Sequence, residues 1–245
     1  MRVLDLFAGL HGWSQAFKDR GHDVRTLEIN PKQPATYCMD IRDFAKNPRL
    51  FLGGWVPDVI LASPPCQGFS TATMGKSWSM GHEHDSVLGE RRPKTPRAAE
   101  GVELVQAALR VVRDLNPRWW WLENPRATLR KLPLMDGLPR VTVTYCQYGD
   151  PTMKPTDLWG HFPDTWKPKP VCSNGDPCHI RAPRGSRTGT QGGGRLLHPQ
   201  MSNHNGPGDW PKGHDAALRG LIPTGLSLSV CLAVEAAIED NAAAR

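Results

Sequence analysis

Apolar runs and polar turns alternate along the first two-thirds of the chain. β-rich apolar runs lie at residues 2–9, 23–30, 57–65, 118–125 and 140–149, and a polar or glycine-rich turn follows each of them. This pattern predicts strands that are separated by turns.

Helix-like segments lie between several of these runs and near the end of the chain. Residues 13–21, 98–115 and 226–240 carry apolar side chains at helical spacing, and Gly21 and Asn116 are stop signals for the first two. Strands that alternate with helices imply a parallel sheet with crossover connections. We therefore predict an open, doubly wound α/β domain with a mostly parallel sheet, in which ligands bind at the carboxyl ends of the strands.

The texture of the chain changes beyond about residue 160. Residues 160–215 are rich in glycine, proline, asparagine and basic side chains and have almost no apolar periodicity, so we expect a subdomain built from loops. The last helix is expected to pack back on the α/β domain. These features predict a main domain at 1–159, a small second region at 160–219 and a closing helical segment at 220–245.

Composition places the chain among globular proteins without selecting a function. It has 245 residues, of which 39% are hydrophobic and 22% charged, and no apolar run reaches the length of a membrane span. The N-terminal segment lacks the charged and apolar regions of a signal peptide, so we expect a cytoplasmic protein. Six cysteines without dense regular spacing are better treated as reduced thiols than as a disulfide scaffold.

The formal net charge of +6 permits a polyanionic partner such as a nucleic acid. Basic proteins without such a ligand are common, so charge alone decides little.

The turn after the first strand has the features of a nucleotide site. It reads DLFAGLHG over residues 5–12, between a strand and a helix, where backbone amides can approach a ligand closely. Glu28 ends the second strand, where a carboxylate can accept both hydroxyls of a ribose, although taken alone such a residue is more often a helix-entry or solvated carboxylate. Asp40 and Ile41 could hold the edge and the face of an adenine. Together these positions favour an adenosine site.

Two further strand ends carry reactive groups. Two prolines precede Cys66, so its direction is fixed, and its thiol becomes a good nucleophile when ionised. The alternative is a small buried apolar side chain. Glu123 follows three tryptophans and precedes Asn124 and Pro125, so its carboxyl could be desolvated and hold a proton near neutral pH, as a general acid requires. The alternative is a structural carboxylate that caps the next turn.

Taken together, these segments resemble the cytosine-C5 methyltransferases that use S-adenosylmethionine. The motifs that carry the resemblance occur in the family's order and cover roughly residues 1 to 160 plus the closing helix. They are 5-DLFAG-9, Glu28, 40-DI-41, 64-PPCQGFS-70, 123-ENP-125, 147-QYG-149 and 154-KPTDLW-159. Their combination is far more specific than any single motif. It implies a Rossmann-like methyltransferase fold and DNA (cytosine-5-)-methyltransferase activity.

The resemblance also implies a role for each matching residue. Cys66 would add to C6 of cytosine while Glu123 donates to N3, so that C5 can attack the methyl group of the donor. Lys154 completes the implied catalytic set. The residues implied in binding S-adenosylmethionine are Phe7, Ala8, Gly9, Leu10, His11, Gly12, Glu28, Ile29, Asp40, Ile41, Pro64 and Ser227.

The implied partner is double-stranded DNA, bound by a monomer, with no membrane partner. The target base must leave the stack, and Gln67, Ser70 and Lys76 are expected to contact DNA. They start the polar, basic segment at residues 68–97, which suits a mobile loop that closes over the flipped base. The alternative is an ordinary solvated insertion.

The chain departs from the family pattern at three places. His11 replaces one of two paired glycines, so it is expected to crowd or contact the donor. Thr152, Lys154 and Thr156 stand where the family has a glutamine and two arginines, and only Lys154 keeps a cation. Ser227 is the one polar residue retained in the closing motif.

The region at 160–219 is the expected target-recognition region, because its basic and polar side chains suit phosphate and base-edge contacts. The residues expected to contact DNA there are Arg181, Arg184, Arg187, Thr188, Gln191 and Arg195.

The same region contains Cys172, Cys178 and His179, which with His161 could form a zinc site. Their spacing matches no common zinc module, so we expect reduced cysteines that pack a loop, without a metal.

Two other functions share these motifs: methylation of cytosine in RNA, and DNA binding by a catalytically inactive relative. Intact Cys66 and Glu123 argue against the inactive relative. A restriction companion, an orphan modifier and a phage enzyme that masks its own genome would look alike, although the compact size favours the last two.

Overall fold

The structure is a computed structural model, which describes residues 1–70, 73–85, 89–150, 152–173, 175–179 and 220–243. Its centre is one seven-stranded sheet in the order β3-β2-β1-β4-β7-β9-β8. The strands of this sheet are β1 (Arg2–Leu6), β2 (Asp23–Glu28), β3 (Tyr37–Cys38), β4 (Val59–Ala62), β7 (Trp119–Pro125), β8 (Arg140–Thr144) and β9 (Pro155–His161).

Parallel pairing joins the first five strands in this order, and β9 runs antiparallel to both of its neighbours. The predicted open, mostly parallel α/β sheet is therefore confirmed. From β1 the chain builds outward to β2 and β3 on one side, and then returns to place β4 on the other side. This reversal of strand order lies between β1 and β4, and ligands of open α/β sheets bind at such a point.

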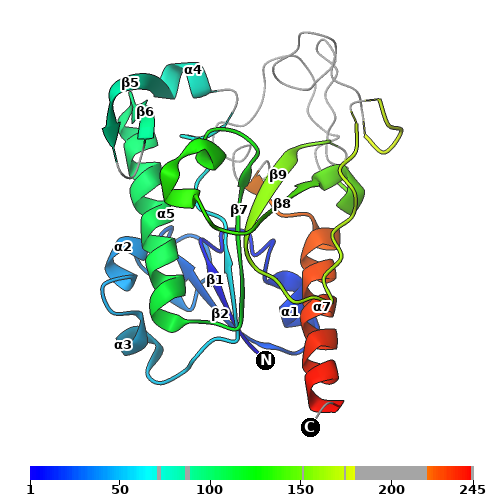
Figure 1. Cartoon of the computed structure of the whole chain (residues 1–245). Coiled ribbons are helices and arrows are strands. Elements are labelled where there is room, and N and C mark those ends of the chain that lie inside the picture. The colour runs from blue at the N-terminus through cyan, green and yellow to red at the C-terminus, as the bar shows by residue number, and fades with distance from the viewer. Residues whose placement is uncertain (71–72, 86–88, 151, 174, 180–219, 244–245) are drawn as a thin grey trace.

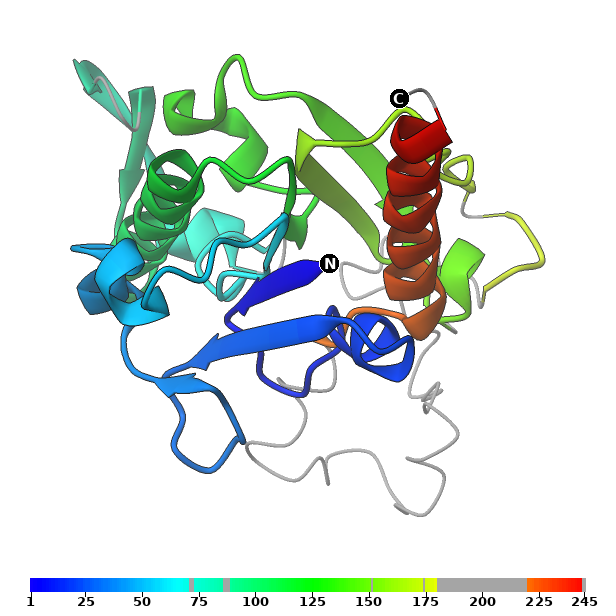
Figure 2. The same cartoon turned by 90° about the horizontal axis from the view of Figure 1, so that it is seen from below.

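Helices cover both faces of the sheet (Figure 1). One face carries α2 (Ile41–Phe44), α3 (Pro48–Leu52) and α5 (Pro96–Leu115), and the other carries α1 (Gln15–Asp19) and α7 (Thr224–Ala243). Seen from below, α1 again lies beside α7, with α5 on the opposite side (Figure 2). The shorter 3-10 helices are η1 (Leu129–Lys131), η2 (Pro133–Met135) and η3 (Tyr145–Tyr148).

Successive residues of the central strands enter two separate cores. In β1, Leu4 and Leu6 belong to the core under α2, α3 and α5, whereas Val3 belongs to the core under α1 and α7. In β4, Ile60 enters the first core and Leu61 the second. A strand that is buried on both faces needs apolar side chains at every position, which explains the continuous apolar runs.

The two long helices agree with the predicted segments. Thr95 caps the start of α5 by accepting a hydrogen bond from the Ala98 amide at 3.3 Å, and Asn116 ends this helix in the left-handed conformation. No helix among the described residues, α5 and α7 included, is long and apolar enough to cross a bilayer.

The segment at 68–97 corrects one expectation, because much of it has regular structure. Its described part forms α4 (Met74–Ser77) and an antiparallel hairpin of β5 (Trp78–Asp85) and β6 (Gly89–Pro93). Trp78 anchors the start of this hairpin, because its Nε1 donates to the Gly68 carbonyl at 2.6 Å and its ring stacks on Phe69. The hairpin strands lack apolar alternation, so their sequence resembled a loop. Closure of the segment over a base stays a prediction.

The sheet extends into the region predicted to begin at residue 160, since β9 ends at His161. Trp166 then packs edge-on against Trp121 of β7, with ring centroids 5.9 Å apart. Residues 180–219 lie outside the described part, so the proposed division into three regions stays a prediction.

The contact between α7 and η3 predicts the effect of one substitution. A Cβ at Gly225 would lie 2.5 Å from the Tyr148 carbonyl oxygen, so Gly225→Ala must push α7 away from η3. We expect a loss of about 1–3 kcal/mol in the free energy of unfolding, measured by urea denaturation. Gly75→Ala is the matched control, since a Cβ there would meet nothing within 4 Å. A Gly225→Ala protein as stable as the parent would contradict this packing.

Candidate active site

The loop after β1 is a tight turn held by Glu28. Phe7, Gly9 and His11 all have positive φ angles, of 62°, 47° and 59°, so the backbone folds back on itself. The Glu28 carboxylate accepts hydrogen bonds from the Gly9 and Asn30 amides, both at 2.9 Å. This side chain therefore joins the carboxyl ends of β1 and β2.

A cavity of about 150 Å³ lies between this loop and the chain that leads into α7. Gly12 permits the close approach of the two segments, because a Cβ there would lie 2.9 Å from the Ile222 amide nitrogen. Ser227 holds α7 in place by donating a hydrogen bond to the Trp13 carbonyl. The residues that line the cavity are Asp5, Phe7, Ala8, Gly9, Leu10, Gly12, Trp13, Ser63, Gly220, Leu221 and Ile222.

Asp5 places a buried carboxyl group in the wall of this cavity. Its side chain is almost fully shielded from solvent, and hydrogen bonding from nearby Ser14 opposes the effect of this burial on the carboxyl group only in part. Burial raises the pKa of Asp5 to about 7. A positively charged group in the cavity would favour the ionised form, so the wall suits a cationic ligand.

His11 lies on the same loop with a half-buried side chain. Burial lowers the pKa of its imidazole, so the ring is neutral at physiological pH. Its Nδ1 atom is buried and has no hydrogen-bond partner within the described part of the chain. The neutral His11 imidazole therefore lies on the loop that the sequence predicts to bind the methyl donor. Whether it crowds or contacts that donor stays a prediction.

The other residues predicted to hold a nucleotide lie at the ends of β2 and β3. Ile29 is 61% exposed, whereas Ile41 is 3% exposed and packs in the core. Asp40 caps α2 by accepting from the Arg42 amide at 2.8 Å, and it pairs with the Arg42 guanidinium at 2.7 Å. Hydrogen bonds from Arg42 lower the pKa of Asp40, so this carboxylate is ionised and already engaged.

Cys66 lies on a rigid turn after β4. Pro64 is buried next to the sheet, and the amides of Phe69 and Ser70 donate to the Cys66 carbonyl at 2.9 and 3.0 Å. The Asn124 side chain donates to the Pro64 carbonyl at 3.0 Å. This buried hydrogen bond ties the turn that carries Cys66 to the strand that carries Glu123.

Glu123 is 4% exposed at the carboxyl end of β7. The Tyr145 hydroxyl donates to its Oε1 atom at 2.8 Å. Burial raises the pKa of Glu123, and the positive charge of Lys154 opposes that shift. The expected desolvation of this carboxyl group is therefore confirmed. Burial raises the pKa of Tyr145 well above its usual value, and the neighbouring Glu123 and, to a smaller extent, Cys66 add to this shift.

Lys154 lies above the other face of this arrangement. Its Nζ atom is 4.2 Å from the centroid of the Tyr145 ring, a cation–π contact. Thr152 donates to the Asp150 carboxylate at 2.6 Å, and Thr156 donates to the Lys154 carbonyl at 3.1 Å. The two threonines thus shape the backbone around Lys154.

Tyr145 was missed by sequence reasoning, although it links Glu123 to Lys154. It lies two residues before the QYG motif at 147–149, and that position was the available signal. A tyrosine at a strand end has many uses, so the pattern alone gave no reason to select it.

The residues predicted to contact DNA are only partly described. Gln67 is exposed beside Cys66, Lys76 is exposed on α4, and the Ser70 hydroxyl lies 3.1 Å from the Thr73 hydroxyl. The remaining ones lie outside the described residues: Arg181, Arg184, Arg187, Thr188, Gln191 and Arg195.

Cys172, Cys178 and His179, the three residues that the sequence singled out for a possible zinc site, lie together. The fourth residue beside them is Cys146, not His161. His161 lies elsewhere, and its Nδ1 atom is 2.8 Å from the Arg118 carbonyl oxygen.

Comparison with known proteins places these motifs in a family context. Residues 1–131 match the family model described as C-5 cytosine-specific DNA methylase. A protein of frog virus 3 (isolate Goorha), named "Probable DNA (cytosine-5)-methyltransferase", is 31% identical over 184 residues, which are 71% of this chain and 78% of that protein. The type II methyltransferase M.AplI of Arthrospira platensis is 39% identical over 77 residues, or 30% of this chain and 22% of that protein.

Solved structures also match the chain. The S. pombe Dnmt2 methyltransferase aligns with a TM-score of 0.40 and 18% identity, over 65% of this chain and 48% of that structure. The matched part is thus about half the length of that solved structure.

Asp5 predicts how stability depends on pH. Its pKa is about 7 in the folded chain against 3.8 for an ordinary aspartate, so between these values the folded state holds a proton that the unfolded state has released. The free energy of unfolding therefore falls as pH rises through this window, by up to about 4 kcal/mol. Asp5→Asn removes this loss, so its gain in Tm over the parent should be larger at pH 8 than at pH 4.

Thermal unfolding at both pH values measures this difference. Asp164→Asn, at an exposed position, is the control and should show the pH dependence of the parent. Equal Tm differences between Asp5→Asn and the parent at the two pH values would contradict the raised pKa.

Proposed function

Because the chain belongs to the C-5 cytosine-specific DNA methylase family, we propose that it transfers a methyl group from S-adenosylmethionine to C5 of cytosine in double-stranded DNA. The carrying observation is the hydrogen bond at 3.0 Å from Asn124 to the Pro64 carbonyl. It fixes the turn of Cys66 against the strand of Glu123, so a nucleophile and an acid are held at one edge of the sheet.

The cavity beside β1 is the proposed site for S-adenosylmethionine, which would supply an electrophilic methyl group on a positively charged sulfur. The buried Asp5 carboxyl suits that positive charge, and the close approach at Gly12 leaves the loop amides near the ligand. Glu28 and Asp40 are the acceptors proposed for the ribose and the adenine. Both would have to share or exchange hydrogen bonds that they now make with Gly9 and Arg42.

Cys66 is the proposed nucleophile. Its thiolate forms a bond from Sγ to C6 of cytosine, and the electrons of the C5–C6 double bond move toward C5 and N3. Glu123 donates its proton to N3, so no full negative charge develops on the ring. C5 then carries the electron pair that bonds to the methyl group, whose former bond to sulfur breaks and leaves a neutral thioether. The C5 proton passes to solvent, its bonding pair restores the C5–C6 double bond and expels the Cys66 thiolate, and the proton on N3 returns to Glu123.

Glu123 must be protonated to act in this way, and its burial favours the protonated form. The Tyr145 hydroxyl occupies Oε1, which leaves Oε2 as the oxygen that carries the proton. After proton transfer, the same hydroxyl and the charge of Lys154 stabilise the carboxylate. Burial therefore raises the pKa of Glu123, while Tyr145 and Lys154 limit that rise, so the carboxyl group can both hold a proton and release it.

Access to the base requires that it leave the DNA stack, which costs a few kcal/mol. The segment with Gln67, Ser70 and Lys76 starts beside Cys66, so it is placed to contact a flipped nucleotide and its phosphates. We keep cytosine in RNA as a second candidate substrate because the same catalytic groups would serve it.

Substitution of Cys66 tests the proposed chemistry. DNA with 5-fluorocytosine at the target should form a covalent complex with the parent protein. Fluorine at C5 leaves no proton to remove there, so the step that releases Cys66 is blocked. Cys66→Ser should form none and should lose at least about 1,000-fold in methylation rate. Cys38→Ser changes an exposed thiol on β3 and should behave as the parent.

Denaturing gels score the trapped complex, and bisulfite sequencing scores methylation in cells that express each variant. Intact DNA binding without any trapped complex would favour an inactive DNA-binding relative. Trapping on RNA and not on DNA would transfer the proposal to an RNA substrate.

Substitution of Tyr145 tests its role as a positioning residue for Glu123. Tyr145→Phe removes the hydrogen bond that lowers the pKa of Glu123, so that pKa should rise further. Glu123 then stays protonated to higher pH, and the alkaline limb of the kcat/KM profile should move to higher pH. We also expect kcat to fall by roughly 10- to 100-fold, since the carboxylate product is less stable.

Tyr148→Phe is the matched control for this measurement. Its hydroxyl accepts a hydrogen bond from the Lys169 amide at 2.8 Å, in the same 3-10 helix but without a bond to Glu123. It should leave the alkaline limb unchanged. Equal pH profiles for the Tyr145→Phe and Tyr148→Phe variants would exclude a specific effect of Tyr145 on Glu123.

A further inference from the structure

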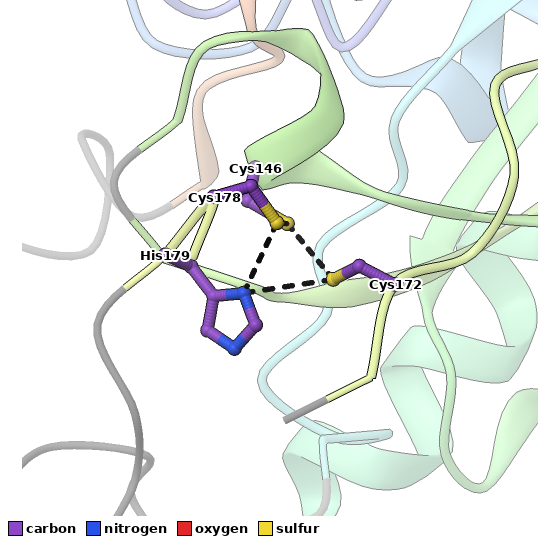
Figure 3. Close-up of side chains that lie close together, drawn as sticks. All are labelled: Cys146, Cys172, Cys178 and His179. Carbon is purple, nitrogen blue, oxygen red and sulfur yellow. Dashed lines mark hydrogen bonds between the residues drawn. The ribbon is translucent and has the colours of Figure 1, made fainter. Parts of the chain in front are cut away.

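A compact group of sulfur and nitrogen atoms lies next to Tyr145 in the chain (Figure 3). Cys146 comes from η3, whereas Cys172, Cys178 and His179 come from the segment after β9. Their three Sγ atoms and a ring nitrogen of His179 all lie within 4.8 Å of one another. Two separate parts of the chain therefore bring four metal-binding side chains to one point.

Three of four separations between these atoms agree with one coordination sphere, and the separation between the Cys146 and Cys172 sulfurs is shorter. The Sγ atom of Cys146 is 3.1 Å from that of Cys172 and 3.6 Å from that of Cys178. The Nδ1 atom of His179 is 3.6 Å from the Cys172 sulfur and 3.4 Å from the Cys178 sulfur.

A tetrahedral zinc ion with bonds of roughly 2.3 Å to sulfur and 2.0 Å to nitrogen places sulfurs roughly 3.8 Å apart and sulfur roughly 3.5 Å from nitrogen. A disulfide would need roughly 2.05 Å between two sulfurs, and it would leave the third thiol unmatched.

We propose that Cys146, Cys172, Cys178 and His179 bind one structural zinc ion. Three thiolates and an imidazole are a ligand set that selects zinc, and four protein ligands complete its tetrahedral shell. No position then remains for a water molecule, which distinguishes a structural site from a catalytic one. A cluster of several iron atoms would require ligand atoms farther apart than these four.

The surroundings of the four side chains suit such an ion. Cys146, Cys172 and His179 are 7%, 7% and 8% exposed, so three of the four ligands are shielded from water. His179 turns Nδ1 toward the sulfurs, and its buried Nε2 has no hydrogen-bond partner within the described residues. The Nε2 atom of the Gln147 side chain donates to the Cys178 sulfur at 3.3 Å, and this hydrogen bond would stabilise the thiolate form of Cys178.

A second group of side chains that could bind a metal is already held together by ion pairs. His22, Cys231 and Glu235 also lie together, between α1 and α7. There the Glu235 carboxylate pairs with the Arg20 guanidinium at 2.7 Å and with His22 at 2.9 Å. These contacts neutralise the carboxylate, so this group is an ion-pair network. The cysteine group has no such cation at its centre among the residues described.

The position of the proposed ion suggests what it stabilises. Cys146 directly follows Tyr145, which holds Glu123, and His179 directly precedes residues 180–219, the region proposed to recognise DNA. Residues 167–179 include three prolines and two lysines, and the buried side chains described in this stretch are two of the proposed ligands, Cys172 and His179. Bound zinc contributes its binding free energy to the folded state, so it can replace the missing core. It would join the start of that region to the corner that positions the catalytic acid.

Metal content of the full-length, tag-free protein tests this proposal directly. Protein expressed with zinc in the medium and purified with a non-chelating reductant should contain about one zinc ion per chain by mass spectrometry of the metal. Cys172→Ser should reduce this content at least about tenfold. Cys38→Ser is the matched control, since Cys38 is exposed on β3 and lies outside the group, and it should keep its zinc.

Cobalt substitution keeps the test decisive if Cys172→Ser fails to fold. Metal-free parent protein titrated with Co²⁺ should develop the visible bands of tetrahedral cobalt and an intense thiolate charge-transfer band, saturating at one equivalent. Addition of zinc should abolish both bands. Zinc should also raise the Tm of the metal-free protein.

Two results would overturn the proposal. One is a parent protein without stoichiometric zinc that gives no thiolate band with Co²⁺. The other is a parent protein in which alkylation under non-reducing conditions finds two of the three cysteines joined in a disulfide. Neither result affects the proposed methyl transfer, which the trapping experiment at Cys66 tests separately.

Discussion

The parallel pairing of β4 with β1 on one side and β7 on the other is the constraint on which the site depends. It aligns Leu6 with Ala62 and Ala62 with Leu122, so β1 and β4 end at one level of the sheet, and Glu123 is the first residue of β7 beyond that level. The loop of the cavity, the Cys66 turn and the Glu123 side chain therefore lie at the same edge of the sheet. Both faces of these strands are buried by helices, which prevents the strands from sliding. The geometry of the reacting groups is thus set by the core and needs little help from the loops.

This sheet buries the carboxyl groups of Asp5, Glu123 and Asp157, of which Asp157 is paired with the Arg130 guanidinium at 2.7 Å. Asp5 lies in β1 and Glu123 in β7, and burial raises the pKa of both. Ionisation of a carboxyl group in such a buried position lowers the free energy of unfolding. Their environments differ in a useful way. Glu123 has a phenol and a cation as neighbours, whereas Asp5 lies in the wall of the cavity near Ser14. Neighbouring protein side chains thus set the pKa of Glu123, whereas a positively charged ligand in the cavity would stabilise the ionised form of Asp5.

Most of this arrangement could be predicted from the sequence because it depends on local signals. Apolar runs marked the strands of the parallel sheet, and the residues at their ends, from Phe7 to Glu123, marked the candidate site. The contributions of Tyr145 and Cys146 could not be predicted in this way. Each becomes important through a partner that is distant in the chain, Glu123 for the first and Cys172 for the second. The β5–β6 hairpin was missed for another reason, since its polar strands show no alternation of apolar and polar residues.

Tyr145 and Cys146 are neighbours in the chain, and this adjacency links the two proposals made above. The backbone turns sharply after β8, so one side chain enters the sheet edge and the next faces the segment that follows β9. A shift of η3 would therefore move the hydrogen bond to Glu123 and the sulfur of Cys146 together. Gly225 packs against Tyr148 in the same 3-10 helix, so α7 restrains η3 from its other end. The corner at η3 is then held by three independent contacts, which is more than its length of four residues would otherwise support. Rigidity at this corner is what the proposed role of Glu123 as an acid requires, because in that proposal its proton must be presented to one ring nitrogen and not to water.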